Sequence, residues 1–448
     1  MTADRPNIDA IFSDIHPSLS HQAAIVEANR CLNCFDAPCT TACPTHIDVP
    51  GFIGKIARGN LRGSALRILD ANILGLSCSR VCPVDVLCEG SCVMHGRGER
   101  PIAIGLLQRH AMERFYESGA RMTLPVAPQR AQHVACVGGG PASLACAAEL
   151  RRFGFPVTIF ESRAIAGGLN AFGVAEYKLN ASDSRREVDF VRSLGVAIET
   201  GATVGENLSL EELESNYAAI FIGIGLGAGS RLENAAGGTR GIDALRFIEA
   251  YKKREPVPVG RQVIVIGGGN TAVDAACAAK RLGAGEVTLA YRRREREMPA
   301  FAFEIAHARA EGVNLLFQVE PFAFHAGATV GSPVGSMEFR RTRLTEPDAS
   351  GRPGIEPDFG TEFAIPCDML ITAIGQSKLL ELLERFQTVE LRDGRVVIDP
   401  ATGRTSNSKY FAGGDCVSGG REVVDAVADG KRAARGIAAM LSREAPLG

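Results

Sequence analysis

Eight of the thirteen cysteines lie between Cys31 and Cys92, in two runs whose spacing is typical of bound metal. The first run is Cys31-x2-Cys34-x4-Cys39-x3-Cys43-Pro44, and the second is Cys78-x3-Cys82-Pro83-x4-Cys88-x3-Cys92. Thiolate sulfur binds zinc and iron–sulfur clusters well. In ferredoxins with two clusters, the cysteine that precedes a proline often ligates the other cluster. We therefore expect two clusters whose ligands are interleaved along the chain.

A glycine-rich motif further along the chain predicts a dinucleotide site. The apolar run 133–137 leads into Gly138-Gly139-Gly140-Pro141-Ala142-Ser143, and an alanine-rich helix then extends to Leu150. The next apolar run ends in Glu161, 23 residues after Gly138. In the dinucleotide fingerprint, glycines let the backbone approach the pyrophosphate and an acid at this distance binds a ribose hydroxyl. A simple glycine turn is the alternative, but the flanking strand, helix and acid favour a nucleotide.

The same pattern recurs about 130 residues later, with one informative change. The run 262–266 precedes Gly267-Gly268-Gly269-Asn270-Thr271-Ala272, and a second strand is expected over 286–291. Tyr291 stands where the first copy has its acid, and Arg292, Arg293 and Arg294 follow at once. An acid suits the ribose of FAD or NAD, whereas arginine suits a 2′-phosphate. A solvated charged loop is the alternative, since Glu295 and Glu297 interleave with the arginines.

Two segments near the C-terminus complete the expected flavin site. Residues 367–376 read as a buried strand that ends in a glycine turn, and residues 410–415 as a strand that ends in Gly413-Gly414-Asp415. Asp415 could accept a hydrogen bond from a ribityl hydroxyl of a flavin. A helix over 423–441 would direct its positive N-terminus at the flavin.

The elements that position these residues predict an α+β multidomain protein. Residues 1–125 should form an α-helical iron–sulfur domain, with helices near 21–30, 49–72 and 102–115, whose small core gains part of its folding free energy from the clusters. Two Rossmann-like α/β dinucleotide-binding domains, for FAD and NAD(P)H, should follow it. We expect the FAD domain over 126–250 and 366–448, and the NAD(P)H domain inserted over 251–365.

Composition excludes several other classes of protein. The net charge of the 448 residues is −2 and there is no tryptophan, so we expect no nucleic-acid partner. No apolar run reaches the ~18 residues that span a bilayer, so no membrane partner is expected either. The N-terminus lacks the features of a secretory signal. Many cysteines without such a signal favour metal binding in a reducing cytoplasm over disulfides.

Taken together, these motifs resemble the glutamate synthase small-subunit-like superfamily over essentially the whole chain. Within it, the resemblance is closest to the separate NAD(P)H-oxidising FAD/iron–sulfur subunit of bacterial dihydropyrimidine dehydrogenase. The segments that carry it are 31–39, 82–92 and 104–108. Glutamate synthase small subunits are typically shorter between the cysteines that match Cys82 and Cys88.

The resemblance implies two [4Fe–4S] clusters and assigns their ligands. One cluster would be held by Cys31, Cys34, Cys39 and Cys92, and the other by Cys43, Cys82, Cys88 and Gln108. Spacing alone favours Cys78 as the eighth ligand, because thiolate is the usual donor to such clusters. An amide on a helix surface is the alternative role for Gln108.

The resemblance also implies which residues bind the dinucleotides. Gly138, Gly140 and Ser143 would approach the FAD pyrophosphate, Glu161 the ribose, and Asp415 the ribityl chain. Gly168 and Leu169 would lie beside the flavin, with Lys178 as a basic residue near FAD. The NAD(P)H phosphates would be held by Gly267, Gly269, Asn270 and Thr271, and the 2′-phosphate of NADPH by Arg292 and Arg293. NADH remains an alternative donor, since some relatives lack the arginines.

The expected function is that of an NAD(P)H-dependent electron-input subunit of dihydropyrimidine dehydrogenase. A hydride passes from NAD(P)H to FAD, and single electrons then leave through two [4Fe–4S] clusters. Because the cofactors carry the chemistry, no catalytic side chain is expected. An FMN-containing partner would reduce uracil or thymine, in a heterodimer or heterotetramer.

Three alternatives can be tested against the structure. The first is a glutamate synthase small subunit or a related NAD(P)H:acceptor reductase, and the second is a zinc-binding interaction protein. The third, a flavin disulfide reductase, requires a Cys-x-x-Cys pair outside the cysteine runs. The five cysteines found there are not spaced in that way.

Overall fold

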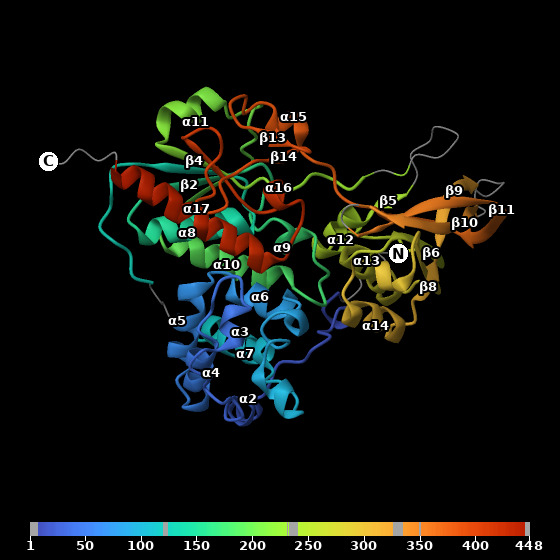
Figure 1. Cartoon of the computed structure of the whole chain (residues 1–448), viewed down its shortest axis with the longest axis horizontal. Coiled ribbons are helices and arrows are strands. Elements are labelled where there is room, and N and C mark those ends of the chain that lie inside the picture. The colour runs from blue at the N-terminus through green and yellow to red at the C-terminus, as the bar shows by residue number, and fades with distance from the viewer. Residues whose placement is uncertain are drawn as a thin grey trace, which may run out of the picture. The chain divides into compact units, whose positions relative to one another are not determined.

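The computed structural model describes residues 8–119, 124–230, 232, 241–325, 335–348 and 351–443. The chain forms two compact units, which are described separately (Figure 1). The larger unit comprises Ile15–Ala171, Lys178–Leu226 and Lys378–Gly448. The smaller unit comprises Met1–Asp14, Phe172–Tyr177 and Gly227–Ser377.

The N-terminal part of the larger unit is the expected helical domain, coloured blue in Figure 1. Side-chain oxygens of Ser20, Asp48 and Asn60 accept from backbone N–H groups in the first turns of three of its helices, so each start is fixed locally. Phe52, Ile53 and Leu107 are fully buried between the helices. The elements are α2 (His21–Ala28), α3 (Pro38–Thr41), α4 (Val49–Ala57), α5 (Leu61–Ala71), α6 (Gly75–Val81), η1 (Val84–Val86), η2 (Val93–Arg97) and α7 (Ile104–Glu117).

The remainder of the larger unit is a Rossmann-like domain. Its five parallel strands lie in the order β15-β4-β1-β2-β3, which places the strand before the first glycine loop at the centre. The strands are β1 (Val134–Val137), β2 (Val157–Glu161), β3 (Ala197–Thr200), β4 (Ala219–Ile222) and β15 (Tyr410–Ala412). The helices are α8 (Pro141–Arg152), α10 (Ala181–Ser193), α11 (Leu210–Asn216), α15 (Leu380–Leu383), α16 (Asp415–Ser418) and α17 (Val423–Arg443), with a short β13 (Leu391–Arg392) and β14 (Arg395–Val396) pair.

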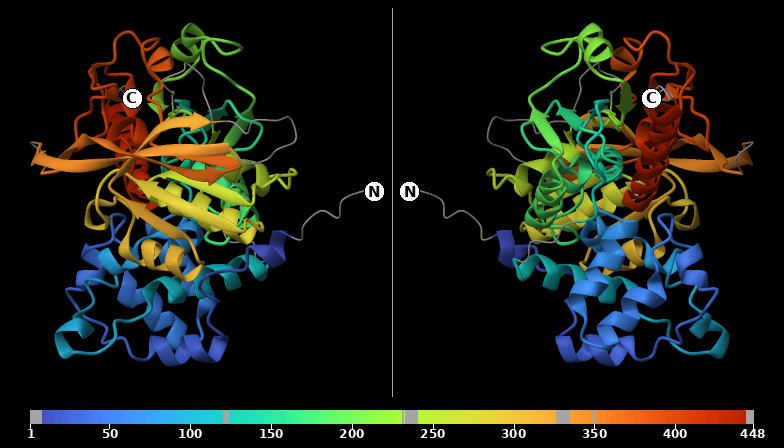
Figure 2. Two further views of the ribbon diagram at one scale, coloured as in Figure 1. Left: turned by 90° about the vertical axis from the view of Figure 1, so that its right-hand side faces the viewer. Right: turned by 90° about the vertical axis from the view of Figure 1, so that its left-hand side faces the viewer.

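A second parallel sheet, ordered β5-β12-β6-β7-β8, forms the smaller unit. A three-stranded antiparallel sheet adjoins it, and its long strands are orange in Figure 2. The parallel strands are β5 (Ile242–Asp243), β6 (Gln262–Gly267), β7 (Glu286–Tyr291), β8 (Asn314–Phe317) and β12 (Met369–Ala373). The antiparallel strands are β9 (Val319–His325), β10 (Gly335–Pro347) and β11 (Pro353–Cys367), and the helices are α12 (Ala244–Lys252), α13 (Asn270–Arg281), η3 (Glu295–Glu297) and α14 (Ala302–Ala310).

The predicted fold class is confirmed: a helical domain precedes two Rossmann-like domains. The boundaries differ from those expected at 251 and 366. Strand β12 pairs with β6, with Met369 opposite Val263, so it belongs to the smaller unit, which extends to Ser377. Helix α12 also lies in this unit. An apolar strand reads the same in either sheet, so only its pairing shows where the domain ends.

The N-terminal residues also belong to the smaller unit, which the sequence did not indicate. After α1 (Ile8–Ile11), the Phe12 ring stacks on Tyr251 at 4.7 Å and on Tyr177 at 6.3 Å between centroids. The Arg281 guanidinium lies 4.5 Å from the centre of the Tyr177 ring and donates to the Ser13 carbonyl at 2.9 Å. Residues 8–14 are therefore anchored by aromatic stacking rather than by the helical domain.

No helix in the described parts of the chain is both long enough and apolar enough to cross a membrane.

Helix α17 packs against α8 through Gly430, and this contact gives a stability prediction. A Cβ at Gly430 would lie 2.1 Å from the Ala142 carbonyl oxygen and 2.9 Å from the Cys146 nitrogen. Because backbone atoms cannot move aside cheaply, Gly430→Ala should lower the free energy of unfolding by about 1–3 kcal/mol. Helix propensity alone predicts a gain of about 1 kcal/mol. Urea unfolding distinguishes the two signs, with exposed Ala439→Gly as the propensity control.

Candidate functional site

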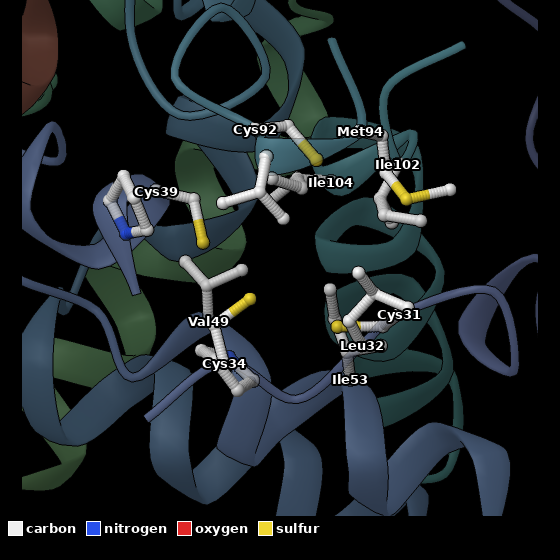
Figure 3. Close-up of a pocket in the computed structure, with 13 residues that line it drawn as sticks. Cys31, Leu32, Cys34, Cys39, Val49, Ile53, Cys92, Met94, Ile102 and Ile104 are labelled. Atoms are coloured by element: carbon white, nitrogen blue, oxygen red, sulfur yellow. The ribbon is translucent and has the colours of Figure 1, made fainter. Parts of the chain in front are cut away.

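One cavity in the helical domain is surrounded by four of the predicted ligands. Its walls include Cys31, Cys34, Cys39 and Cys92, as Figure 3 shows, and its volume is about 360 Å³, including space open to solvent. Ile53 and Ile104 are among the apolar residues that complete the wall. The structure thus brings together sulfur atoms from both cysteine runs: three from the first and one from the end of the second. Four thiols around a cavity match the donor set of a [4Fe–4S] cluster.

Burial disfavours the ionised form of two of these thiols. Desolvation raises the pKa of Cys31 and raises the pKa of Cys39 to about 11. Cluster ligands are thiolates, so positive charge is needed in the cavity to stabilise them. Bound iron would supply that charge.

The remaining four cysteines of the two runs form a second group. Cys82 and Cys78 are hydrogen-bonded through their thiols, and this bond, followed by burial, raises the pKa of Cys82 well above its usual range. Cys43 and Cys88 are close enough to raise it further. Burial likewise raises the pKa of Cys88. Spacing alone predicts this group of four thiols.

Gln108 is not an amide on a helix surface. Its side chain is buried, and Nε2 donates to the Gly75 carbonyl at 2.7 Å, at the start of the helix that carries Cys78. The amide oxygen is then the atom that could bind iron. Of the two candidates for the eighth ligand, Cys78 lies on α6 and Gln108 is hydrogen-bonded to the start of that helix.

The spacing of the thiols argues against zinc. Among the described residues, no three His, Cys, Asp or Glu side chains are close enough together to hold a single metal ion. Four thiolates on one zinc, each at about 2.3 Å, would bring their sulfurs within about 4 Å of one another. A cluster separates its ligands further, because each thiolate binds a different iron atom. Cys78 and Cys82 contact one another through their thiols, but among the described residues no third side chain completes a site for a single ion, so the arrangement fits a cluster better than a zinc knuckle.

Helix α6 is joined to the Rossmann-like domain by buried polar contacts that the sequence did not reveal. The Glu187 carboxylate, on α10, accepts from the Leu76 and Ser77 backbone nitrogens at 2.8 and 3.0 Å and from the Ser77 hydroxyl. Arg80, near the end of α6, pairs with Asp183 at 2.8 Å. No local pattern could indicate these partners, which lie about 100 residues apart in the chain.

The first glycine loop forms a cradle in which side chains would clash. Gly138 has a φ of +93°, and a Cβ there would lie 2.6 Å from the Gly223 carbonyl oxygen. Gly168 approaches from a second loop, where a Cβ would lie 2.9 Å from the Gly140 Cα. Gly140 is the N-cap of α8, so the loop opens onto free N–H groups of a 12-residue helix. This arrangement fits the pyrophosphate of FAD.

Other predicted FAD residues surround this cradle. Glu161 ends β2 and is buried, with Oε2 accepting from the Gly139 nitrogen at 2.7 Å. Ser143 Oγ is buried and makes no hydrogen bond with any described residue. Asp415 follows Gly414, where a Cβ would lie 3.0 Å from that of Ala142, and burial raises the pKa of the Asp415 carboxyl. The three loops thus meet at the start of α8.

The other two predicted FAD residues, Leu169 and Lys178, are not part of the cradle itself. Leu169 follows Gly168 directly and is 37% exposed at the start of α9 (Leu169–Phe172). Lys178 is buried, and its carbonyl oxygen accepts from Arg80 Nη1 at 3.5 Å. Lys178 therefore lies where the helical domain meets the Rossmann-like domain.

The second glycine loop repeats the geometry of the first without its acid. Gly267 has a φ of +149°, and a Cβ there would lie 2.3 Å from the Ala373 carbonyl oxygen. The Tyr291 ring fills the position of the acid, 2.4 Å from where a Cβ of Gly268 would be. Gly269 is the N-cap of α13 and faces open space, while the Asn270 Oδ1 accepts from the Phe301 nitrogen at 3.2 Å. Thr271 follows in the first turn.

The two arginines predicted for a 2′-phosphate differ in their surroundings. Arg292 is exposed at the end of β7, whereas Arg293 is buried. Arg293 Nε donates to the Pro353 carbonyl at 2.8 Å, so part of this guanidinium is already used within the protein.

Comparison with known proteins agrees with this organisation. Residues 8–120 match the family described as dihydropyrimidine dehydrogenase domain II, 4Fe-4S cluster, and residues 132–430 match pyridine nucleotide-disulphide oxidoreductase. The glutamate synthase [NADPH] small chain of Escherichia coli is 35% identical over 95% of this chain and 93% of its own length. The NADP(+)-dependent formate dehydrogenase subunit beta of Moorella thermoacetica is 38% identical over 89% of this chain, which spans 59% of that protein.

Solved structures show the same fold in the nucleotide-binding part. Mycobacterium tuberculosis FprA has a TM-score of 0.57 and 18% identity, covering 70% of this chain and 85% of its own. The thioredoxin reductase of T. acidophilum has a TM-score of 0.54 and 18% identity, covering 69% and 98% of the two chains.

Gln108→Ala and Cys78→Ser test which residue is the eighth cluster ligand. If Gln108 binds iron, Gln108→Ala should alter the EPR signal or the iron content of one cluster. Cys78→Ser should then leave the iron content at the wild-type value. The reverse pattern would identify Cys78 as the ligand.

Proposed function

The chain belongs to the pyridine nucleotide-disulphide oxidoreductase family, and we propose that it is the electron-input subunit of a multi-subunit NADPH-dependent oxidoreductase. In this proposal it holds FAD and two [4Fe–4S] clusters. One observation supports it above the others: the cysteine-bearing helix α6 and the FAD cradle are parts of one compact unit, linked by Glu187 and Arg80. Such a link would keep a cluster and a flavin at a fixed separation.

The family name includes a disulphide, but the cysteines here do not support that chemistry. Outside the two runs, all five cysteines are buried and none of them forms a disulfide. One pair, Cys136 and Cys146, is hydrogen-bonded inside the Rossmann-like core, and burial raises the pKa of Cys146. A thiol of this kind is inert. Electrons would therefore leave through the helical domain rather than through a redox-active disulfide.

Each proposed cofactor has a distinct set of binding residues. Flavin takes up a hydride from a reduced nicotinamide, and iron–sulfur clusters transfer single electrons. Gly138, Gly140 and Gly168 leave space for the pyrophosphate, Glu161 is placed to accept from a ribose hydroxyl, and Asp415 from the ribityl chain. The first cluster would take Cys31, Cys34, Cys39 and Cys92, and the second Cys43, Cys82, Cys88 and either Gln108 or Cys78.

The surroundings of the two cysteine groups suggest the direction of electron flow. The group on α6 lies next to the Rossmann-like domain, through the contacts of Arg80 and Glu187. The other group opens near exposed apolar residues: Phe35 is 100%, Leu32 49% and Val93 36% exposed. Leu32 and Val93 line the cavity itself. We infer that electrons enter at the α6 group and leave at the Cys31 group, where a partner covers these residues.

NADPH is the proposed donor because the second glycine loop lacks the acid of the first. A buried tyrosine replaces the carboxylate that would repel a 2′-phosphate, and exposed Arg292 follows it. A charge-assisted hydrogen bond to phosphate contributes about 1.5–3 kcal/mol. A single such bond could favour NADPH over NADH by tenfold or more.

The partner is the finer part of the proposal. A glutamate synthase large subunit or a related acceptor is favoured, because the small chain of the Escherichia coli enzyme matches almost end to end. The second candidate is an FMN-containing subunit that reduces uracil or thymine, which the family matched by residues 8–120 favours. Either assembly would be a heterodimer or heterotetramer, and we place it in the cytoplasm.

Reconstitution with each candidate partner tests this function. The purified chain should contain FAD and acid-labile sulfide, and NADPH should bleach its visible spectrum. NADPH oxidation should then increase when glutamate synthase large subunit, glutamine and 2-oxoglutarate are added. Turnover only with a pyrimidine-reducing subunit and uracil would instead establish the second candidate. A colourless protein that contains zinc would contradict the whole proposal.

Phe35→Ser should separate electron entry from electron exit. The ring is completely exposed, so its removal should not affect folding or the reduction of ferricyanide by NADPH. Turnover coupled to the partner should fall about tenfold, since exposed aromatic rings often dominate binding at interfaces. Phe359→Ser, at a 75% exposed ring in the smaller unit, is the matched control. Equal coupled rates in the two variants would place the partner elsewhere.

A further inference from the structure

We propose that Arg352, immediately before β11, is a third arginine of the anion site at the end of β7 and helps to select NADPH over NADH. The inference rests on the proposed function, in which the second glycine loop binds the pyridine nucleotide. It adds a residue that immediately precedes a strand of the antiparallel sheet, 60 positions along the chain from Arg292.

Three hydrogen bonds attach the antiparallel sheet to the end of β7. Arg293 Nε donates to the carbonyl of Pro353, the residue after Arg352, at 2.8 Å. The Thr342 hydroxyl, on β10, donates to the Arg292 carbonyl at 2.8 Å, and the Gln318 nitrogen donates to the Arg293 carbonyl at 3.1 Å. The backbone at Arg352 is therefore held beside the two arginines that follow Tyr291.

Three guanidinium groups meet here beside two described carboxylates: Asp348 Oδ1 accepts from the Arg352 backbone nitrogen at 3.2 Å, and Glu320 acts on Arg292. Partial desolvation of the exposed Arg292 side chain lowers its pKa, and the nearby positive charges of Arg293 and Arg352 lower it further. The carboxylate that acts on Arg292 is that of Glu320, which is already paired with Arg340 at 2.6 Å. Arg293 is 7% exposed, and its Nη1 makes no hydrogen bond with any described residue. Such a cluster of guanidinium groups favours a bound anion with more than one negative charge.

The 2′-phosphate of NADPH is the anion that fits this position. In the dinucleotide fold, the residue at the end of the second strand faces the 2′ oxygen of the adenosine ribose. Tyr291 occupies that position and donates from its hydroxyl to the Glu297 carbonyl at 2.7 Å, so it offers no carboxylate. Arg292 and Arg352 are both exposed and can reach a phosphate from two sides, one from the parallel sheet and one from the antiparallel sheet.

Arg352→Ala tests the inference, with Arg343→Ala as the control. Arg343 is also exposed and lies on β10, where alternation directs its side chain away from the face on which Thr342 bonds to Arg292. Binding to the full chain is measured by calorimetry with adenosine 2′,5′-bisphosphate and with adenosine 5′-monophosphate. The KM values for NADPH and NADH are measured with ferricyanide as acceptor.

Arg352→Ala should weaken adenosine 2′,5′-bisphosphate binding and raise the KM for NADPH by about tenfold each. Adenosine 5′-monophosphate binding and the KM for NADH should stay at their wild-type values, and Arg343→Ala should change none of the four. If the wild type prefers NADPH and Arg352→Ala behaves like Arg343→Ala, the inference is wrong and the proposed function stands. If the wild type does not distinguish the two probes, the NADPH assignment fails and the inference fails with it.

Discussion

The larger unit depends on one contact, in which the Glu187 carboxylate of α10 binds the first turn of α6. The carboxylate accepts two backbone N–H groups and one hydroxyl in the first turn of a helix, where the helix dipole favours negative charge. Burial nevertheless raises the pKa of Glu187 to about 8, against the lowering effect of these hydrogen bonds. Burying a carboxylate costs free energy unless hydrogen bonds compensate for the lost water. The three donors on α6 provide that compensation for Glu187. Here the carboxylate fixes the helix that presents Cys78 and Cys82 against the Rossmann-like domain.

The same helix also contacts α7, which carries the other candidate ligand, Gln108. Gly75 belongs to the turn that Glu187 caps, and its carbonyl holds the Gln108 amide from α7. Arg80, one turn later, pairs with Asp183 and with Glu113, again joining α10 to α7. Side chains on two helices, α7 and α10, are thus oriented by one short helix. A displacement of α6 would disturb the candidate ligands and the domain contact together.

Local features of the sequence were sufficient for the helices, for the central strands and for both glycine loops. Gly138 and Gly267 adopt positive φ values that only their lack of a side chain allows, so the motif and the geometry coincide. Pairing between distant segments was not predictable in this way. Strand β12 reads as a buried strand wherever it lies, and its assignment to the smaller unit depends on its partner β6.

Side-chain direction was the other property that the sequence could not supply. Arg292 and Arg293 are adjacent and chemically identical, yet one is exposed and the other is buried beside Pro353. Successive residues near the end of a strand point to opposite faces, so two arginines in a row cannot both face one phosphate in the same way. The antiparallel sheet, which decides what Arg293 contacts, has no signature in the glycine motif.

The contact between Cys78 and Cys82 has different consequences for the two candidate ligand sets. If Cys78 binds iron, both sulfurs are thiolates and the hydrogen bond between them is lost. If Gln108 binds iron, Cys78 remains a thiol and can donate its S–H to the sulfur of coordinated Cys82. Hydrogen bonds to ligand sulfur are among the factors that set the potential of a cluster. A count of ligands alone leaves the burial of Cys78 unexplained. In this second case Cys78 would act as a hydrogen-bond donor to the cluster nearest the flavin domain.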